Sequence, residues 1–110
     1  MKESILKQKS FDFVKAIYSY CGGLREKRFD YAIVDQLIRS GTSIGALIRE
    51  AEFAQSRPDF INKPSIALKE ANETIYWMDL IKAVTGPNDG IRSNEELLLS
   101  ELKGMLIASI

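Results

Sequence analysis

The chain has 110 residues, of which 45% are hydrophobic and 27% are charged, so it can bury one core and we expect a single domain over residues 1–110. It contains no histidine, which excludes imidazole general bases, histidine-activated nucleophiles and imidazole metal sites. Its 15 basic and 15 acidic residues cancel, which disfavours a general phosphate-binding surface.

The single cysteine and the absence of long apolar runs indicate where the protein works. Cys21 cannot close an intrachain disulfide, so the fold is expected to rely on packing in a reducing compartment. No apolar run approaches the ~20 residues that span a bilayer, and the polar start of the chain lacks the apolar segment of a signal peptide. We therefore expect a cytoplasmic protein without a membrane partner.

The first half of the chain has helical rather than alternating periodicity. One helix is predicted over residues 4–28 and a second over residues 30–55, with Asp30 as its N-cap. The break that follows contains Pro58, which suits the opening of the next helix.

The second half continues this pattern. A third helix is predicted from residue 58 to about residue 85, with Pro64 early enough for its missing N–H to matter little. Gly86 suits a C-terminal cap, and Ser93 with Glu96 has the spacing of a capping box that opens a fourth helix over residues 93–110. Four helices with short connections predict an all-α fold, an antiparallel up-down-up-down four-helix bundle.

The first helix has more apolar surface than a small bundle needs on one side. Two neighbouring stripes are predicted to face protein: Phe11, Val14, Tyr18 and Cys21, and Phe13, Ile17, Tyr20 and Leu24. This wide arc is compatible with burial inside one chain or against another subunit.

The third helix favours an oligomer. Its inner face is predicted to consist of Phe60, Ala67, Leu68, Ala71, Ile75 and Met78. A second face holds Ile66, Trp77, Leu80, Ile81 and Val84 among charged residues, a composition typical of a protein interface. The apolar end of the chain, residues 105–110, is also expected to lie against protein.

The second and third helices can be aligned as an αα-hairpin. If they turn near residue 57, facing positions sum to about 113, because antiparallel helices of equal rise keep partners equidistant from the turn. The register pairs Glu50 with Lys63, Ser43 with Glu70, Arg39 with Glu73 or Thr74, and Gln36 with Trp77. The candidate polar cluster or interface is therefore Gln36, Arg39, Ser43, Glu50, Lys63, Glu70, Glu73 and Trp77. Structural pairing is the favoured interpretation, and a ligand site is the alternative.

The common arrangements of catalytic residues do not match this sequence. Di-iron bundles need histidine, and two carboxylates within one turn, such as Glu70 and Glu73, need a pocket and a raised pKa for acid–base work. Cys21 lies on a predicted core stripe, where its thiol would be inert. Gly41 and Gly45 lack the lysine of a phosphate loop and suit close helix packing. We expect no catalysis, no metal and no cofactor.

Several motifs resemble a known bacterial family. They are QLIRSGTSIGA at 36–46, REA at 49–51, AQS at 54–56, DFI-x-K at 59–63, IALKEA at 66–71 and ET-x-YW at 73–77. Together they resemble the four-helix bundle family named after proteins encoded in intervening sequences of 23S ribosomal RNA. The resemblance implies an up-down-up-down bundle that assembles into a homopentameric ring. The accessory protein of diversity-generating retroelements is similar, and it binds reverse transcriptase and nucleic acid through a basic surface.

Two functions follow as expectations. The favoured one is a non-enzymatic, self-associating scaffold or adaptor, with a homo-oligomer as its assembled form and a protein as a possible partner. The alternative is an RNA- or nucleic-acid-binding accessory protein, because the first 28 residues carry seven basic and three acidic side chains. That alternative requires convergence of Lys2, Lys7, Lys9, Lys15, Arg25, Lys27 and Arg28 on one surface.

Overall fold

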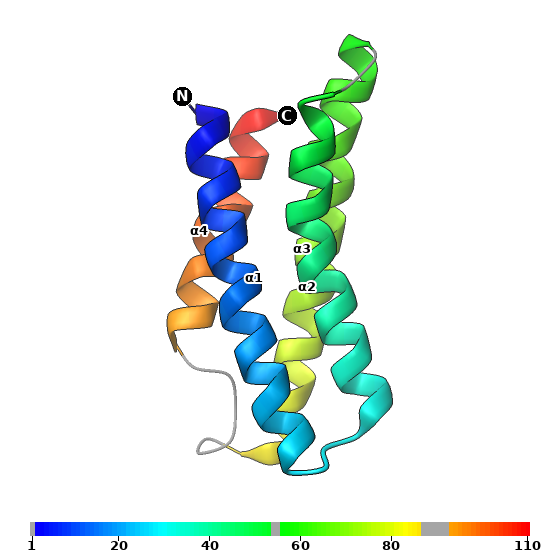
Figure 1. Cartoon of the computed structure of the whole chain (residues 1–110), viewed down its shortest axis with the longest axis vertical. Helices are drawn as coiled ribbons and strands as arrows, with labels where there is room; N and C mark the ends of the chain where they lie inside the picture. The colour runs from blue at the N-terminus through cyan, green and yellow to red at the C-terminus, as the bar shows by residue number, and fades with distance from the viewer. Residues whose placement is uncertain (1, 54–55, 87–92) are drawn as a thin grey trace.

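The computed structural model describes residues 2–53, 56–86 and 93–110 of the chain (Figure 1). All the regular structure in these ranges is helical, as the sequence predicted. The helices are α1 (Lys2–Glu26), α2 (Tyr31–Ala51), α3 (Arg57–Thr85) and α4 (Ser93–Ser109).

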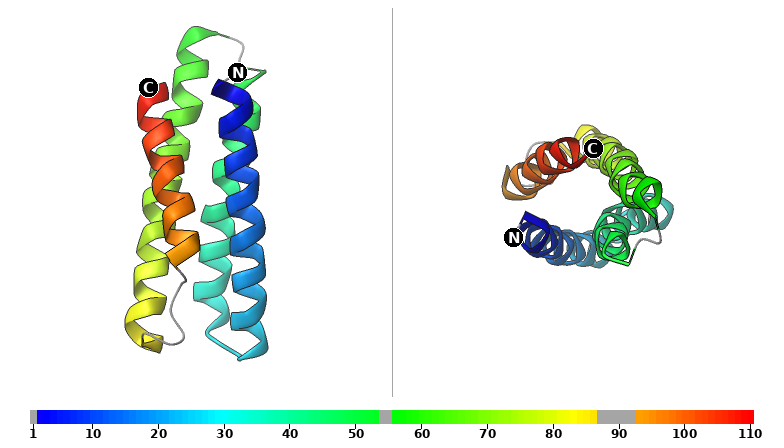
Figure 2. Two further views of the ribbon diagram at one scale, coloured as in Figure 1. Left: turned by 90° about the vertical axis from the view of Figure 1, so that its left-hand side faces the viewer. Right: turned by 90° about the horizontal axis from the view of Figure 1, so that it is seen from above.

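Successive helices run in opposite directions along a molecule of 44 × 23 × 18 Å (Figure 1). Seen along its axis, the molecule has α1 and α3 at diagonal corners (Figure 2). Each of these two helices packs against both α2 and α4, whereas the backbones of diagonally opposite helices stay apart over the described residues. The arrangement is the expected antiparallel up-down-up-down bundle.

Local signals set several helix ends. The Asp30 carboxylate accepts hydrogen bonds from the N–H groups of Ala32 (2.9 Å) and Ile33 (3.4 Å), which confirms it as the N-cap of α2. Gly86 has a φ of 86° and donates its N–H to the carbonyl of Lys82, the left-handed cap expected after α3.

Three helices end at an earlier residue than the sequence predicted. Helix α1 ends at Glu26, because Arg28 adopts a left-handed φ of 60°, which stops a right-handed helix. Helix α2 ends at Ala51, before residue 55, which lies outside the described ranges. Helix α4 ends at Ser109.

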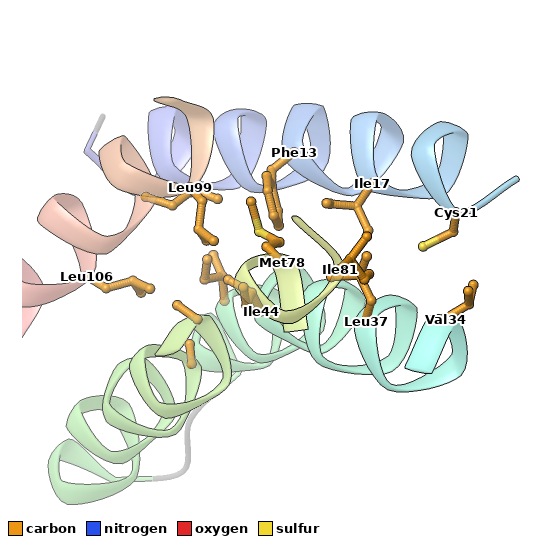
Figure 3. Close-up of a cluster of buried hydrophobic side chains, with 14 of the residues drawn as sticks. Phe13, Ile17, Cys21, Val34, Leu37, Ile44, Met78, Ile81, Leu99 and Leu106 are labelled. Carbon is orange, nitrogen blue, oxygen red and sulfur yellow. The ribbon is translucent and has the colours of Figure 1, made fainter. Parts of the chain in front are cut away.

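The core is a seam of residues repeating every three or four positions on all four helices (Figure 3). In Figure 3, Phe13 and Ile17 of α1 point toward Leu37 and Ile44 of α2. Side chains of α3 and α4 complete the seam, among them Met78, Ile81, Leu99 and Leu106. Burying each large side chain stabilises the fold by roughly 1.5–3 kcal/mol relative to its exposure.

The structure corrects which residues of α1 face this core. The buried stripe combines parts of both predicted stripes and consists of Leu6, Ser10, Phe13, Ile17, Cys21 and Leu24. Phe11 and Tyr18 are exposed, because a helix in a four-helix bundle buries one narrow arc rather than half of its circumference.

The inner face of α3 is also rotated from the predicted one. Thr74 and Ile81 are fully buried, whereas Phe60 is exposed. Ile81 therefore belongs to the core and not to the outer face, because it continues the buried spacing set by Ala71 and Met78.

Pro64 lies within α3 and not near its first residue. The helix begins at Arg57, so Pro64 removes an interior hydrogen bond to the carbonyl four residues earlier. Its ring is buried at the end of the bundle, where apolar packing compensates for part of that loss.

The apolar end of the chain is divided between core and surface. Leu106 is buried, whereas Ile107 and Ile110 are more than half exposed in the single subunit. No helix within the described ranges is long and apolar enough to cross a membrane.

Candidate functional site at the seam between α2 and α3

Arg39 is the centre of the polar cluster. Its Nε donates a hydrogen bond to Oε1 of Gln36 at 3.1 Å, one turn earlier on α2. Its Nη1 reaches Oε2 of Glu70 on α3 at 3.3 Å, and its Nη2 forms an ion pair with Glu73. The αα-hairpin register therefore places Arg39 beside α3 as predicted from the sequence.

Glu73 joins the cluster to an aromatic pair. Its Oε2 also accepts a hydrogen bond from Nε1 of Trp77 at 3.0 Å, and the Trp77 ring lies edge-on to Tyr76 with centroids 4.9 Å apart. The Trp77 indole and then the Arg39 guanidinium lower the pKa of Glu73, because both stabilise its carboxylate form. Glu73 in turn raises the pKa of Arg39.

A buried hydrogen bond lies beneath this surface cluster. The hydroxyl oxygens of Ser40 on α2 and Thr74 on α3 are 3.0 Å apart, and both residues are fully buried. The predicted cluster omitted this pair, although the two residue numbers sum to 114 and fit the register. The available signal was a small polar residue at the core-facing position of each helix.

Three predicted residues do not join the cluster. Ser43 donates its hydroxyl hydrogen bond to the carbonyl of Ser40 within α2 and forms none with Glu70 in the described structure. Glu50 and Lys63 form no ion pair in the described ranges, which corrects the pairing expected there. Glu50 is exposed near the end of α2, where hydration competes well with an ion pair.

The polar cluster is suited to holding α2 and α3 together rather than to proton transfer. A lowered pKa keeps Glu73 ionised at neutral pH, which is the opposite of what a carboxylic general acid needs. Arg39 is 48% exposed and lies at the surface rather than in an enclosed cavity. Cys21 is fully buried, and desolvation raises the pKa of its thiol to about 11, as expected for an inert core cysteine.

A small apolar cavity lies at the end of the bundle near the turn between α2 and α3. It has a volume of about 50 Å³ and is lined by residues such as Leu6, Ile48, Phe60 and Pro64. Ligand pockets in proteins typically have volumes of about 300–1,000 Å³, so this cavity is too small to be one. Across the described residues, no three Cys, Asp or Glu side chains gather closely enough to hold a metal ion.

The fold is an antiparallel all-α bundle in which polar side chains link the second and third helices. The sequence profile of the 23S rRNA-intervening sequence protein family matches residues 2–108, and the chain belongs to this family. A solved structure from Bacteroides thetaiotaomicron, a protein of unknown function from the S23 ribosomal protein family, shares 43% sequence identity. The match covers 98% of this chain and 96% of that one, with a TM-score of 0.82. No curated protein sequence matches the chain.

Proposed function

We propose that the chain self-associates into a homo-oligomer that serves as a non-enzymatic scaffold or adaptor. The observation that supports this proposal most directly is that large apolar side chains remain exposed on the outer sides of α1 and α3. Tyr18 is 68% exposed and Val84 is 66% exposed in the single subunit. Large apolar side chains that share an exposed side of a helix are typical of surfaces that another protein covers. A closed ring, with a pentamer favoured, is the assembly that we expect.

The mass of the native particle tests this proposal. Light scattering at micromolar concentration should return a multiple of the 12.4 kDa chain mass, and five chains for the favoured ring. Copurification from the source cell then tests the adaptor role, because an adaptor should retain a protein partner. A particle of one chain mass at micromolar concentration would overturn the proposal.

The ion pairs of α1 favour this proposal over nucleic-acid binding. Four of its cations already have carboxylate partners: Lys7 with Glu52, Lys9 with Glu101, Lys15 with Asp12, and Arg25 with Asp35. The side chain of Lys2 lies outside the described part of the structure. A neutral chain in which these four cations of α1 are paired gains little from counterion release at that helix. Binding to RNA should therefore be weak and lost as salt rises, and tight binding at high salt would instead support the accessory-protein function.

A further inference from the structure

One outer face of α3 combines apolar groups with a surplus of negative charge. Tyr76, Leu80 and Val84 follow one another at four-residue spacing, so they share one side of the helix. Tyr76 is 59% exposed and Val84 is 66% exposed, while Leu80 is half-buried. We call these three residues the α3 stripe.

Charged groups border the α3 stripe. Arg39 supplies one positive charge against the two carboxylates of Glu70 and Glu73, so that cluster keeps one net negative charge. Exposed Asp79 adds a second on the other flank, and exposed Lys69 offsets one of them. The border of the α3 stripe is therefore negative by one unit.

An outer face of α1 has the opposite character. Phe11 and Tyr18 are seven residues apart on one side of the helix, and they are 46% and 68% exposed. The cations of Lys15 and Arg49 lie 5.4 and 5.3 Å from the centroid of the Phe11 ring. Asp12 pairs with Lys15, which leaves one net positive charge beside the Phe11 ring.

Gly22 extends this face of α1. It follows Tyr18 by four residues, and a Cβ added to it would meet no atom of the chain within 4 Å. A glycine within a helix is unfavourable relative to alanine, and packing inside this subunit offers no compensation for it. A flat patch at Gly22 would let a second helix approach closely. We call Phe11, Tyr18 and Gly22 the α1 stripe.

The two stripes lie on different helices, α1 and α3, which occupy diagonal corners of the bundle (Figure 2). We propose that the α1 stripe of one copy docks on the α3 stripe of a second copy. This inference rests on the proposed self-association and assigns its two faces. The contact is head-to-tail, so each copy uses both stripes and repetition produces a ring or a filament.

Charge disfavours the symmetric alternatives. Two α1 stripes in contact would bring Lys15 and Arg49 of both copies together, and two α3 stripes would oppose Glu73 and Asp79 of both copies. Like charges across an interface are costly, whereas the head-to-tail contact joins opposite charges.

Two single variants and their mixture test the assignment. Tyr18→Glu disables the α1 stripe and Tyr76→Glu disables the α3 stripe, because a carboxylate in an apolar contact loses its hydration. Both tyrosines are more than half exposed, so each subunit should fold, which circular dichroism checks. Leu97→Glu on α4 is the matched control, since Leu97 is 64% exposed and lies outside both stripes.

Each variant alone should sediment as a single chain of 12.4 kDa, and the control should assemble like the wild type. An equal mixture of the two variants should give a particle of two chains, because one intact α1 stripe meets one intact α3 stripe. Assembly of either single variant at wild-type mass, or dissociation by Leu97→Glu, would overturn the assignment of the faces. A wild-type particle of one chain would instead overturn the self-association on which the assignment rests.

A second pair of variants tests the close approach at Gly22. Gly22→Leu should raise the dissociation constant of the assembly by about tenfold or more, because it overpacks the contact. Gly23→Leu is the matched control, since Gly23 is equally open but points to another side of α1. Equal dissociation constants for the two variants would remove Gly22 from the interface.

Discussion

Ser40 of α2 and Thr74 of α3 are joined by a 3.0 Å hydrogen bond inside the core, directly beneath the ion pairs of Arg39. A shift of either helix by one residue would leave both buried hydroxyl groups without each other. Each hydroxyl also contacts a carbonyl of its own helix, Leu37 for Ser40 and Glu70 for Thr74. The bond between the two hydroxyls is therefore the interaction that depends on the register of the hairpin, and it helps to fix that register.

Thr74→Val should lower the free energy of unfolding by roughly 1–2 kcal/mol, because Ser40 keeps only its 3.3 Å contact with the carbonyl of Leu37. Adding Ser40→Ala should cost less than it does in the wild type, because the partner is already gone. Thr42→Val is the control, since both hydrogen bonds of the Thr42 hydroxyl go to carbonyls of α2. Urea unfolding at one protein concentration measures the wild type, the two single variants, the double variant and the control, and additive losses would contradict the coupling.

Arg39→Ala should be much milder than removal of a buried charge. The Arg39 side chain is 48% exposed, so water screens its ion pairs and can solvate the carboxylates that lose their partner. We expect the free energy of unfolding to fall by less than about 1 kcal/mol in the same urea assay. A loss of several kcal/mol would show that the cluster is buried in the native assembly.

The buried face of α2 can be read from the sequence more readily than that of α3, for a physical reason. The apolar residues of α2, such as Val34, Leu37 and Ile44, occupy one narrow arc, and the structure buries that arc. Helix α3 has apolar residues around much of its circumference, so periodicity could not show that Ile81 is buried and Phe60 is exposed. The packing partners on the neighbouring helices make that choice.

The candidate site also contains some contacts that the sequence could predict and others that it could not. Arg39 could be matched to α3 because a charge pair across a hairpin depends on the register alone. The hydrogen bond that joins Thr74 to α2 requires a hydroxyl group supplied by Ser40, which the pattern of α3 does not contain. Glu50 and Lys63 fit the register yet remain apart, because an exposed pair gains too little to hold two long side chains together.

Trp77→Phe should raise the pKa of Glu73 toward its ordinary value of 4.5, because it removes the indole hydrogen bond to the carboxylate. NMR titration of the Glu73 carboxyl carbon measures this pKa. Tyr76→Phe is the control, since it preserves the indole N–H and should leave the pKa where it is in the wild type. An unchanged pKa in Trp77→Phe would show that the indole does not stabilise this carboxylate.

The lowered pKa of Glu73 also predicts how the stability of the fold changes with pH. A carboxyl group whose pKa is lower in the folded state stabilises the fold above its unfolded pKa, and that stability is lost as pH falls through the folded value. The difference in unfolding free energy between the wild type and Glu73→Gln should therefore be largest above pH 4.5 and shrink below it. A difference that grows on acidification would contradict the direction of the shift.

Gly23→Ala and Gly41→Ala should change stability in opposite directions. Alanine is favoured over glycine in a helix by roughly 0.5–1 kcal/mol, and a Cβ at Gly23 would meet nothing within 4 Å, so Gly23→Ala should be stabilising. At Gly41 the added Cβ would lie 3.3 Å from Cγ2 of Ile17 and 3.7 Å from Cε2 of Phe13, and both of these side chains are fully buried.

A packed core accommodates such an addition poorly, and overpacking costs typically about 1–3 kcal/mol, which exceeds the helical gain at Gly41. Urea unfolding of both variants at equal protein concentration should therefore move the midpoint up for Gly23→Ala and down for Gly41→Ala. If Gly41→Ala were as stabilising as Gly23→Ala, Ile17 would have room to move, and the close contact between α1 and α2 would not require a glycine.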